Sequence, residues 1–118
     1  MSMSEADCLF CKIRDGGVPA KLLHRDEDVL AFRDIAPRAP FHALVVPLRH
    51  IATLTEATPE DAALLGQLLL VGSRLATEAG HAASGFRVVM NVGAGAGQSV
   101  FHVHLHVLAG RVLTWPPG

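Results

Sequence analysis

The sequence predicts an α+β domain built on a mostly antiparallel sheet. Apolar segments of strand length stand before and after one long helical pattern, and strands do not alternate with helices as they do in parallel sheets. The chain has 118 residues, of which 50% are apolar, so it is long enough to bury one core. We expect a single domain over residues 1–118, with the polar, acidic residues 1–7 as a disordered N-terminal tail.

The elements before the long helix are predicted from apolar runs and from the turn residues that separate them. Two glycines at positions 16 and 17 end a short N-terminal helix, and acidic residues around Glu27 separate two strands of a hairpin. In chain order we expect a helix over 8–15, strands over 21–26 and 28–34, a loop over 35–40, and a buried strand over 41–47.

The long helix has clear start and stop signals. Thr58 can cap its first turn, Pro59 suits the first helical position, and Asp61 complements the helix dipole. Apolar residues recur at helical spacing before Gly80 ends the pattern, and they are Leu64, Leu65, Leu68, Leu69, Val71 and Leu75. A stripe this broad can contact both the sheet and a second subunit.

Composition excludes several classes of function. The net charge of −1 gives no basic surface for a nucleic-acid backbone or an acidic membrane. No apolar run reaches the length of about 18 residues that spans a membrane, and no signal-peptide core follows the N-terminus. We therefore expect a cytoplasmic protein that binds neither nucleic acid nor membrane.

The segment after the helix contains an unusual row of histidines. A strand over 86–92 and a glycine loop over 93–97 precede a final strand over 100–108. Because side chains alternate along a strand, His102, His104 and His106 share one face, and apolar residues share the other. The row is either a polar surface, a metal site, or a nucleophile with flanking helpers.

The glycine loop bears on that choice. Backbone N–H groups of residues 93–99 can approach an anion closely, because glycines leave them uncovered. A phosphate held beside a neutral imidazole predicts phosphoryl or nucleotidyl transfer through nitrogen.

These residues resemble a known family. The segment from Gln98 to Leu108 is similar to the signature of the histidine triad (HIT) superfamily. Four other stretches resemble its Hint branch, the histidine triad nucleotide-binding proteins, and they are 32–37, 40–42, 90–93 and the ending from Gly110 to Gly118. The resemblance covers the chain from about residue 8 to its end.

The resemblance implies a fold and an activity. The fold would be HIT-like, with a five-stranded antiparallel sheet, one long and one short helix, and a homodimer that joins two sheets into one of ten strands. The activity would be hydrolysis of adenosine 5′-phosphoramidates and related nucleoside monophosphate conjugates through a nucleotidyl-histidine, with no cofactor needed for the chemistry. The substrate would be a purine nucleotide conjugate.

The resemblance also assigns roles to residues. His104 would attack the α-phosphorus, His106 and His42 would contact the phosphate or orient the site, and Ser99 would hold phosphate oxygens. Asp34 would accept hydrogen bonds from both ribose hydroxyls, although the same carboxylate would also suit a turn cap. Further substrate contacts would come from Leu9, Phe10, Ile13, Ile35, Asn91, Gly97, Gln98 and Trp115. Leu44 fits the apolar base slot but is better read as core.

Two cysteines form a C-x-x-C pair at positions 8 and 11, which indicates a redox or metal site. A redox pair normally follows a strand, and the seven polar residues before this pair make the redox interpretation the weaker one. The resemblance supplies two further ligands, His50 and His102, for a structural zinc ion. The alternative is that Cys8 and Cys11 are reduced core thiols.

Three other functions remain open from the sequence. One is hydrolysis of dinucleoside polyphosphates, and a second is purine nucleotide binding without catalysis. A third is a zinc hydrolase that uses the three histidines of the strand as ligands, which would lose activity to a chelator.

Overall fold

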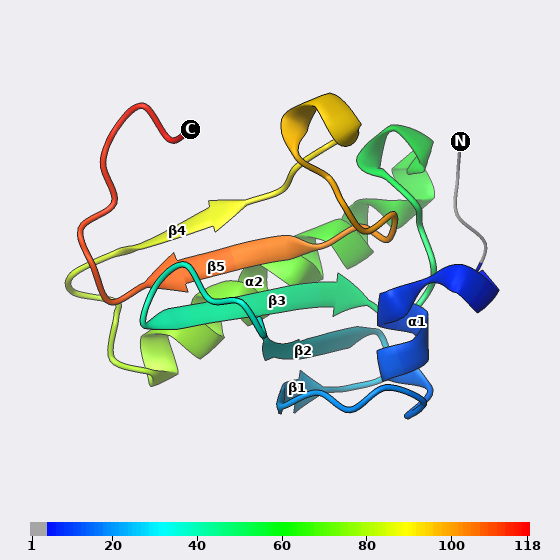
Figure 1. Cartoon of the computed structure of the whole chain (residues 1–118), viewed down its shortest axis with the longest axis horizontal. Coiled ribbons are helices and arrows are strands. Elements are labelled where there is room, and N and C mark those ends of the chain that lie inside the picture. Colours follow the sequence, from blue (N-terminus) through cyan, green and yellow to red (C-terminus); the bar gives the residue numbers. More distant parts are fainter. Residues whose placement is uncertain (1–4) are drawn as a thin grey trace.

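The computed structural model describes residues 5–118 and confirms the α+β fold class. Its elements in chain order are η1 (Glu5–Asp7), α1 (Leu9–Arg14), β1 (Leu22–Arg25), β2 (Val29–Arg33), β3 (Phe41–Pro47), η2 (Leu54–Glu56), η3 (Pro59–Asp61), α2 (Ala62–Glu78), β4 (Phe86–Val89), η4 (Ala94–Ala96) and β5 (Leu105–Ala109). The strands form one antiparallel sheet in the order β1-β2-β3-β5-β4 (Figure 1). No helix in this part of the chain is long and apolar enough to cross a membrane.

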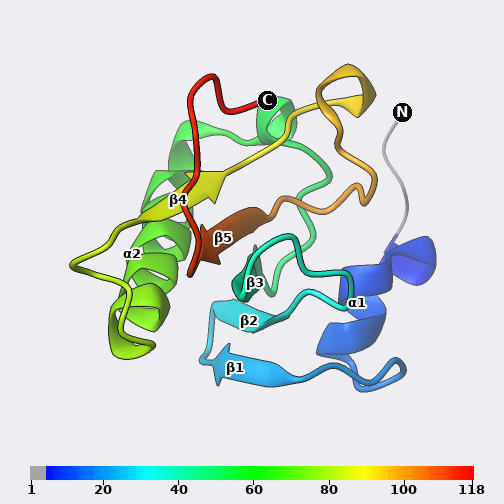
Figure 2. The same ribbon diagram turned by 60° about the vertical axis from the view of Figure 1, so that its left-hand side comes forward.

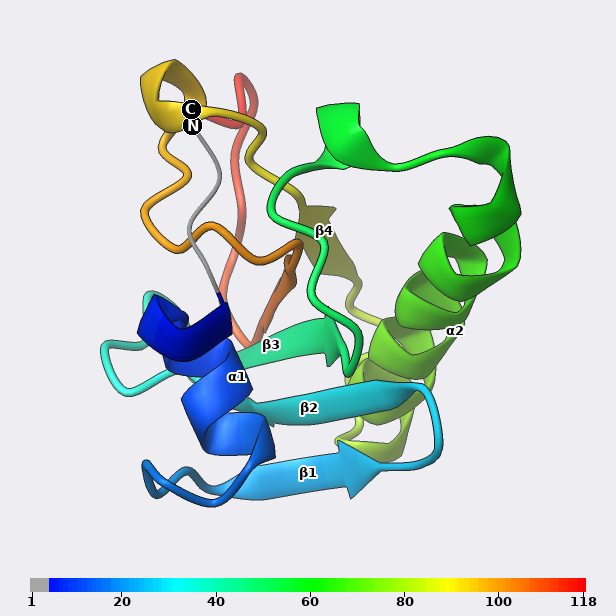
Figure 3. The ribbon, with the colours of Figure 1, turned by 90° about the vertical axis from the view of Figure 1, so that its right-hand side faces the viewer.

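The two α-helices cover opposite faces of the sheet, and Figure 3 shows α1 to the left and α2 to the right. Successive strand residues alternate between two clusters of buried side chains. Val45 and Val107 pack toward α2 with Leu68, whereas Leu44 and Val46 belong to the cluster that contains the α1 side chains. The turned view in Figure 2 shows α1 at one end of the sheet, beside β1 and β2. His42 shares a face of the sheet with Leu44, and so does His106, which pairs with Leu44. These polar side chains of β3 and β5 therefore lie on the face toward α1.

The ends of several elements differ from the sequence prediction. Residues 5–7 form a 3-10 turn, because the Cys8 N–H donates to the Glu5 carbonyl and Arg14 pairs with the Glu5 carboxylate. The prediction of a disordered tail over 1–7 is wrong for these three residues, and residues 1–4 lie outside the described part. The long helix begins with a 3-10 turn over 59–61, where Asp61 is buried and pairs with Arg49.

The last two strands are shorter than predicted. β5 begins at Leu105, because the Val103 N–H donates to the Ile51 carbonyl at 2.7 Å and so takes the preceding segment out of the sheet. β4 ends at Val89, which pairs with His106, the second residue of β5. His102 and His104 consequently stand in an irregular segment before β5 and not within it.

Gly72 lets α2 approach the sheet closely. A Cβ at this position would lie 2.9 Å from Val107 Cγ2 and 3.7 Å from Val45 Cγ2. We expect Gly72→Ala to lower the free energy of unfolding by about 1–2 kcal/mol, because overpacking outweighs the gain in helix propensity. Urea unfolding measures the effect.

Gly66→Ala is the matched control on the same helix, since none of the described residues comes within 4 Å of its Cβ position. We expect that variant to be neutral or stabilised by up to about 1 kcal/mol. Equal changes in the two variants would contradict the close approach at Gly72.

Candidate active site

His42 and His106 form a hydrogen-bonded pair on the α1 face of the sheet. Antiparallel pairing sets Leu44 opposite His106 and His42 opposite Leu108, so the two imidazoles are diagonal neighbours. His42 Nε2 lies 2.9 Å from His106 Nδ1.

The tautomers of this pair follow from one backbone group. The Arg38 N–H donates to His42 Nδ1 at 3.0 Å, so the proton of a neutral His42 is on Nε2. That Nε2–H donates to His106 Nδ1, which leaves the proton of a neutral His106 on its own Nε2. His106 therefore presents an N–H donor at the end of the pair.

His104 carries its proton on the other ring nitrogen, Nδ1. Its Nδ1–H donates to the His102 carbonyl at 2.7 Å, so its Nε2 carries a lone pair. The ring is 5% exposed and meets the edge of Phe10 at a centroid distance of 5.0 Å. Burial lowers the pKa of His104, which favours the neutral, nucleophilic form near pH 7.

Burial also keeps the other two imidazoles neutral. It lowers the pKa of His42, and it lowers the pKa of His106 to about 4 together with repulsion from His104 and His42. The site thus holds a lone pair on His104 next to a donor on His106, and the two ring centroids are 5.1 Å apart.

The low pKa of His106 predicts an acid-sensitive fold. Between the ordinary histidine pKa of 6.5 and about 4, the unfolded chain binds a proton at His106 that the folded chain does not. Stability is therefore fully present above pH 6.5 and falls as the pH drops, by less than the limit of about 1.4 kcal/mol per pH unit because the ring is half-buried. His106→Asn should show a shallower loss in urea unfolding between pH 7 and 5. An unchanged slope would argue against this source of acid sensitivity.

A mostly apolar cavity of about 220 Å³ opens beside His104 and His106. Its apolar wall comes from α1, β2, β3 and the segment after α1, and consists of Leu9, Phe10, Ile13, Val18, Pro19, Ala20, Phe32, Ile35, Leu44 and Val100. Ser99, Arg33 and Asp34 also line it. The sequence did not predict Val18, Pro19, Ala20, Phe32, Arg33 and Val100, because residues of these types give no signal that distinguishes a cavity wall from core or loop.

Asp34 lies between the cavity and the histidine pair. Its Oδ1 accepts from the Ala36 N–H at 2.8 Å, and its Oδ2 is 3.4 Å from His42 Nε2. The turn-capping role is therefore present, and the second carboxylate oxygen stays directed toward the site.

Other predicted site residues lie elsewhere in the single chain. Asn91 and the 82% exposed Trp115 line a separate hollow along β4. The Gln98 side chain is buried and holds the glycine loop, since it accepts from the Gly93 N–H and donates to the Ala52 carbonyl. Gly97 lies against Asn91, because a Cβ added at Gly97 would be 3.7 Å from Asn91 Nδ2.

Four potential metal ligands converge between α1 and the segment before β5. Cys8, Cys11, His50 and His102 bring their ligand atoms within 4.8 Å of one another. His102 Nδ1 lies 3.3 Å from Cys8 Sγ and 3.2 Å from His50 Nδ1, and Cys11 Sγ lies 3.4 Å from His50 Nδ1. In tetrahedral zinc sites the bond lengths of about 2.3 Å to sulfur and 2.0 Å to nitrogen put ligand atoms about 3.3–3.8 Å apart. The four residues therefore fit a zinc ion.

The surroundings orient these ligands. The His102 Nε2–H donates to the Pro47 carbonyl at 2.8 Å, which leaves the Nδ1 lone pair directed at the thiols. Without a cation, burial and the neighbouring Cys8 raise the pKa of Cys11 to about 12. A bound cation reverses that preference, because it stabilises the thiolate.

A metal at the histidine pair itself is disfavoured. The ligand atoms of Asp34, His42 and His106 also lie within 4.8 Å of one another. Since His42 Nδ1 accepts from the Arg38 N–H, a metal on Nε2 would leave that ring without any proton. The geometry thus favours a hydrogen-bond relay over a catalytic metal, and His102 turns toward the cysteines instead.

Comparison with known proteins agrees with this geometry. A family model described as the HIT domain matches residues 15–113. An uncharacterized HIT-like protein of Synechococcus elongatus is 50% identical over 116 residues, covering 98% of this chain and 100% of that protein.

Solved structures are similarly close. A HIT family hydrolase from Legionella pneumophila has a TM-score of 0.93 and 48% identity, covering 95% of this chain and 100% of that chain. A Zn-bound histidine triad family protein from Mycobacterium smegmatis has a TM-score of 0.78 and 35% identity, covering 92% of this chain and 78% of that chain.

The sheet, the imidazoles and the adjoining cavity define an α+β protein with a mostly apolar cavity beside a cluster of histidines. The chain belongs to the HIT family. The sequence prediction of that family, and of its five-stranded fold, is confirmed.

Proposed function

We propose that this chain hydrolyses adenosine 5′-phosphoramidates and related nucleoside monophosphate conjugates, as a member of the Hint branch. The observation that carries the proposal is the hydrogen bond from His104 Nδ1 to the His102 carbonyl. It fixes a lone pair on Nε2 of a neutral imidazole, which is the form that attacks phosphorus. The solved relative from Legionella pneumophila is described as a hydrolase, which supports the reaction class.

In the first step, His104 Nε2 forms a bond to the α-phosphorus and the P–N bond to the amine breaks. The anionic phosphate favours a proton on the His42–His106 pair, because a nearby negative charge stabilises imidazolium. That proton passes from His106 Nε2 to the leaving nitrogen, which keeps the electron pair of the broken bond. The products are an amine and a nucleotidyl-His104.

In the second step, water adds to phosphorus and the bond to His104 Nε2 breaks, with its electron pair returning to the ring. The proton of the water passes to the His42–His106 pair, which regains the protonated state that it had with substrate bound. Ser99 and the backbone of residues 93–98 would hold the phosphate oxygens, with Asn91 beside that loop. Asp34 Oδ2 would accept from the ribose hydroxyls, and the apolar wall would take the base.

The experiment that tests this proposal is a rapid quench of the enzyme during turnover of an adenosine phosphoramidate. Peptide mass spectrometry should locate an adenylyl group on His104, and no adduct should form on His106. Turnover of a diadenosine polyphosphate in place of the phosphoramidate would favour the dinucleotide hydrolase. Binding of AMP with no turnover of any conjugate would favour a non-catalytic binding protein.

We also propose a homodimer that joins two sheets through β4. This strand is at the edge of the sheet, and Leu69 and Leu70 on α2 are 51% and 73% exposed. A partner across this edge would cover both features and form a ten-stranded sheet. Trp115 lies beside the same edge, so it would meet a nucleotide only within such a dimer. Size-exclusion chromatography with light scattering tests the assembly.

Finally, we propose that Cys8, Cys11, His50 and His102 hold a structural zinc ion. The distances among their ligand atoms and the zinc in the Mycobacterium smegmatis relative support this proposal. Since protein ligands fill all four positions, the ion would supply stability and no chemistry.

A further inference from the structure

The end of β5 is packed against the loop that joins β2 to β3. Antiparallel pairing of Phe41 with Ala109 brings the next residues, Pro40 and Gly110, side by side. Gly110 has a φ of +94°, and a Cβ there would lie 2.9 Å from Pro40 Cβ. A side chain at position 110 would therefore be strained and would push the loop away.

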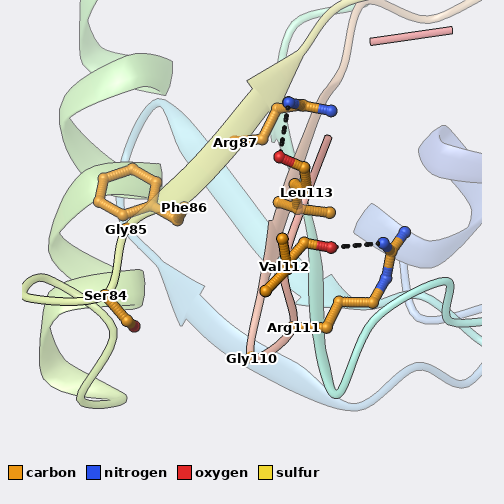
Figure 4. Close-up of a pocket in the computed structure, with 8 residues that line it drawn as sticks. All are labelled: Ser84, Gly85, Phe86, Arg87, Gly110, Arg111, Val112 and Leu113. Carbon is orange, nitrogen blue, oxygen red and sulfur yellow. Dashed lines mark hydrogen bonds between the residues drawn. The ribbon is translucent and has the colours of Figure 1, made fainter. Parts of the chain in front are cut away.

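Arg111 makes a second contact with the same loop. Its Nε–H donates to the Arg38 carbonyl at 2.9 Å, and its NH1 group donates to the Val112 carbonyl at 3.1 Å. Figure 4 shows the second of these bonds, with the Arg111 side chain running alongside the tail. The guanidinium thus joins the loop to the segment that follows β5.

The backbone carbonyl and N–H of Arg38 connect this contact to the histidines. Its carbonyl accepts from Arg111, and its N–H donates to His42 Nδ1. The loop is held at its other end by the Asp34 carboxylate, which accepts from the Ala36 N–H. A shift of residues 36–40 would separate the Arg38 N–H from His42 while leaving both imidazoles in the sheet.

We propose that Gly110 and Arg111 are positioning residues that set the tautomers of His42 and His106 through the Arg38 N–H. The inference rests on the proposed function for its kinetic consequence. If the Arg38 N–H moves away, His42 is free to carry its proton on Nδ1. His106 then loses its donor partner and no longer presents an N–H toward the leaving group.

The first test is Arg111→Ala, with turnover of an adenosine phosphoramidate as the kinetic measurement. We expect kcat to fall about three- to tenfold with KM within about twofold, as expected for one hydrogen bond that acts on proton transfer. Arg111→Lys should recover most of the loss, because an ammonium group can also donate to the Arg38 carbonyl. Arg25→Ala is the matched control, since that exposed arginine lies on the edge strand β1 and likewise donates to a backbone carbonyl, that of Arg14.

The second measurement does not depend on turnover. Nitrogen-15 NMR of the full chain distinguishes a protonated from an unprotonated imidazole nitrogen. In the wild type His42 Nδ1 should give an unprotonated signal, and in Arg111→Ala it should shift toward the protonated value. Gly110→Ala should shift it further, and size-exclusion chromatography shows whether either variant alters assembly.

Unchanged His42 signals in both variants would overturn the inference, as would a loss of kcat in Arg25→Ala equal to that in Arg111→Ala. If the wild type turns over no AMP conjugate, the proposed function fails. The NMR comparison would still decide whether Gly110 and Arg111 control the tautomers.

Discussion

Replacing His104 with alanine should reduce turnover of an adenosine phosphoramidate by a factor on the order of 10³ or more. The variant removes the lone pair on His104 Nε2, which the hydrogen bond from Nδ1 to the His102 carbonyl fixes there. The neighbouring His106 cannot replace it, because its Nε2 carries a proton. Binding of AMP should stay within about threefold, since the apolar wall and Asp34 are left intact. Single-turnover kinetics and calorimetric AMP titration measure the two quantities.

His24→Ala is the matched control for this substitution. His24 lies on the edge strand β1, where it pairs with Asp26 at 2.7 Å and accepts from Arg74. We expect this variant to keep wild-type turnover. A His104→Ala protein that retained more than about a tenth of the rate would show that another group attacks phosphorus.

Loss of the proposed zinc ion should destabilise the fold far more than it slows the reaction. We expect a strong chelator, or Cys11→Ala, to lower the free energy of unfolding by about 3–5 kcal/mol, because the ion binds the folded chain selectively. None of the four ligand residues lines the cavity, so kcat should change by less than about tenfold. Metal analysis should find one zinc per wild-type chain.

The chelator and the substitution act on the same ion, so their effects should not add. Urea unfolding of Cys11→Ala should be the same with and without chelator. The zinc proposal would be contradicted if the wild-type protein contained no metal, or if the chelator left its free energy of unfolding unchanged. Complete loss of turnover on metal removal, with the fold intact by circular dichroism, would instead favour a metal-dependent reaction.

The sequence predicted the sheet, the long helix and the family, because these features rest on local patterns. Strand β3 was predicted at its observed bounds, since a buried apolar run that ends in proline has few alternatives. Alternation also placed His104 and His106 near each other. It failed at the start of the last strand, where a long-range bond from Val103 to Ile51 overrides the local preference.

The remaining features of the site depend on atoms that have no sequence signature. The donor that sets the His42 tautomer is the backbone N–H of Arg38, and any residue except proline supplies that group. The carbonyl that orients His104 is likewise a backbone atom. Sequence patterns identify imidazoles, but the direction in which each ring carries its proton is decided by tertiary contacts.

Helix α1 has six residues, which is too short to be stable alone in water. It nevertheless supplies Leu9, Phe10 and Ile13 to the cavity, and all of these residues precede the segment that the family model matches. One side of the cavity wall therefore lies outside the segment that carries His42, His104 and His106, whereas the rest of the wall lies within it. Substitutions in this first helix would reshape one side of the cavity and leave the His42–His106 hydrogen bond, which joins β3 to β5, in place.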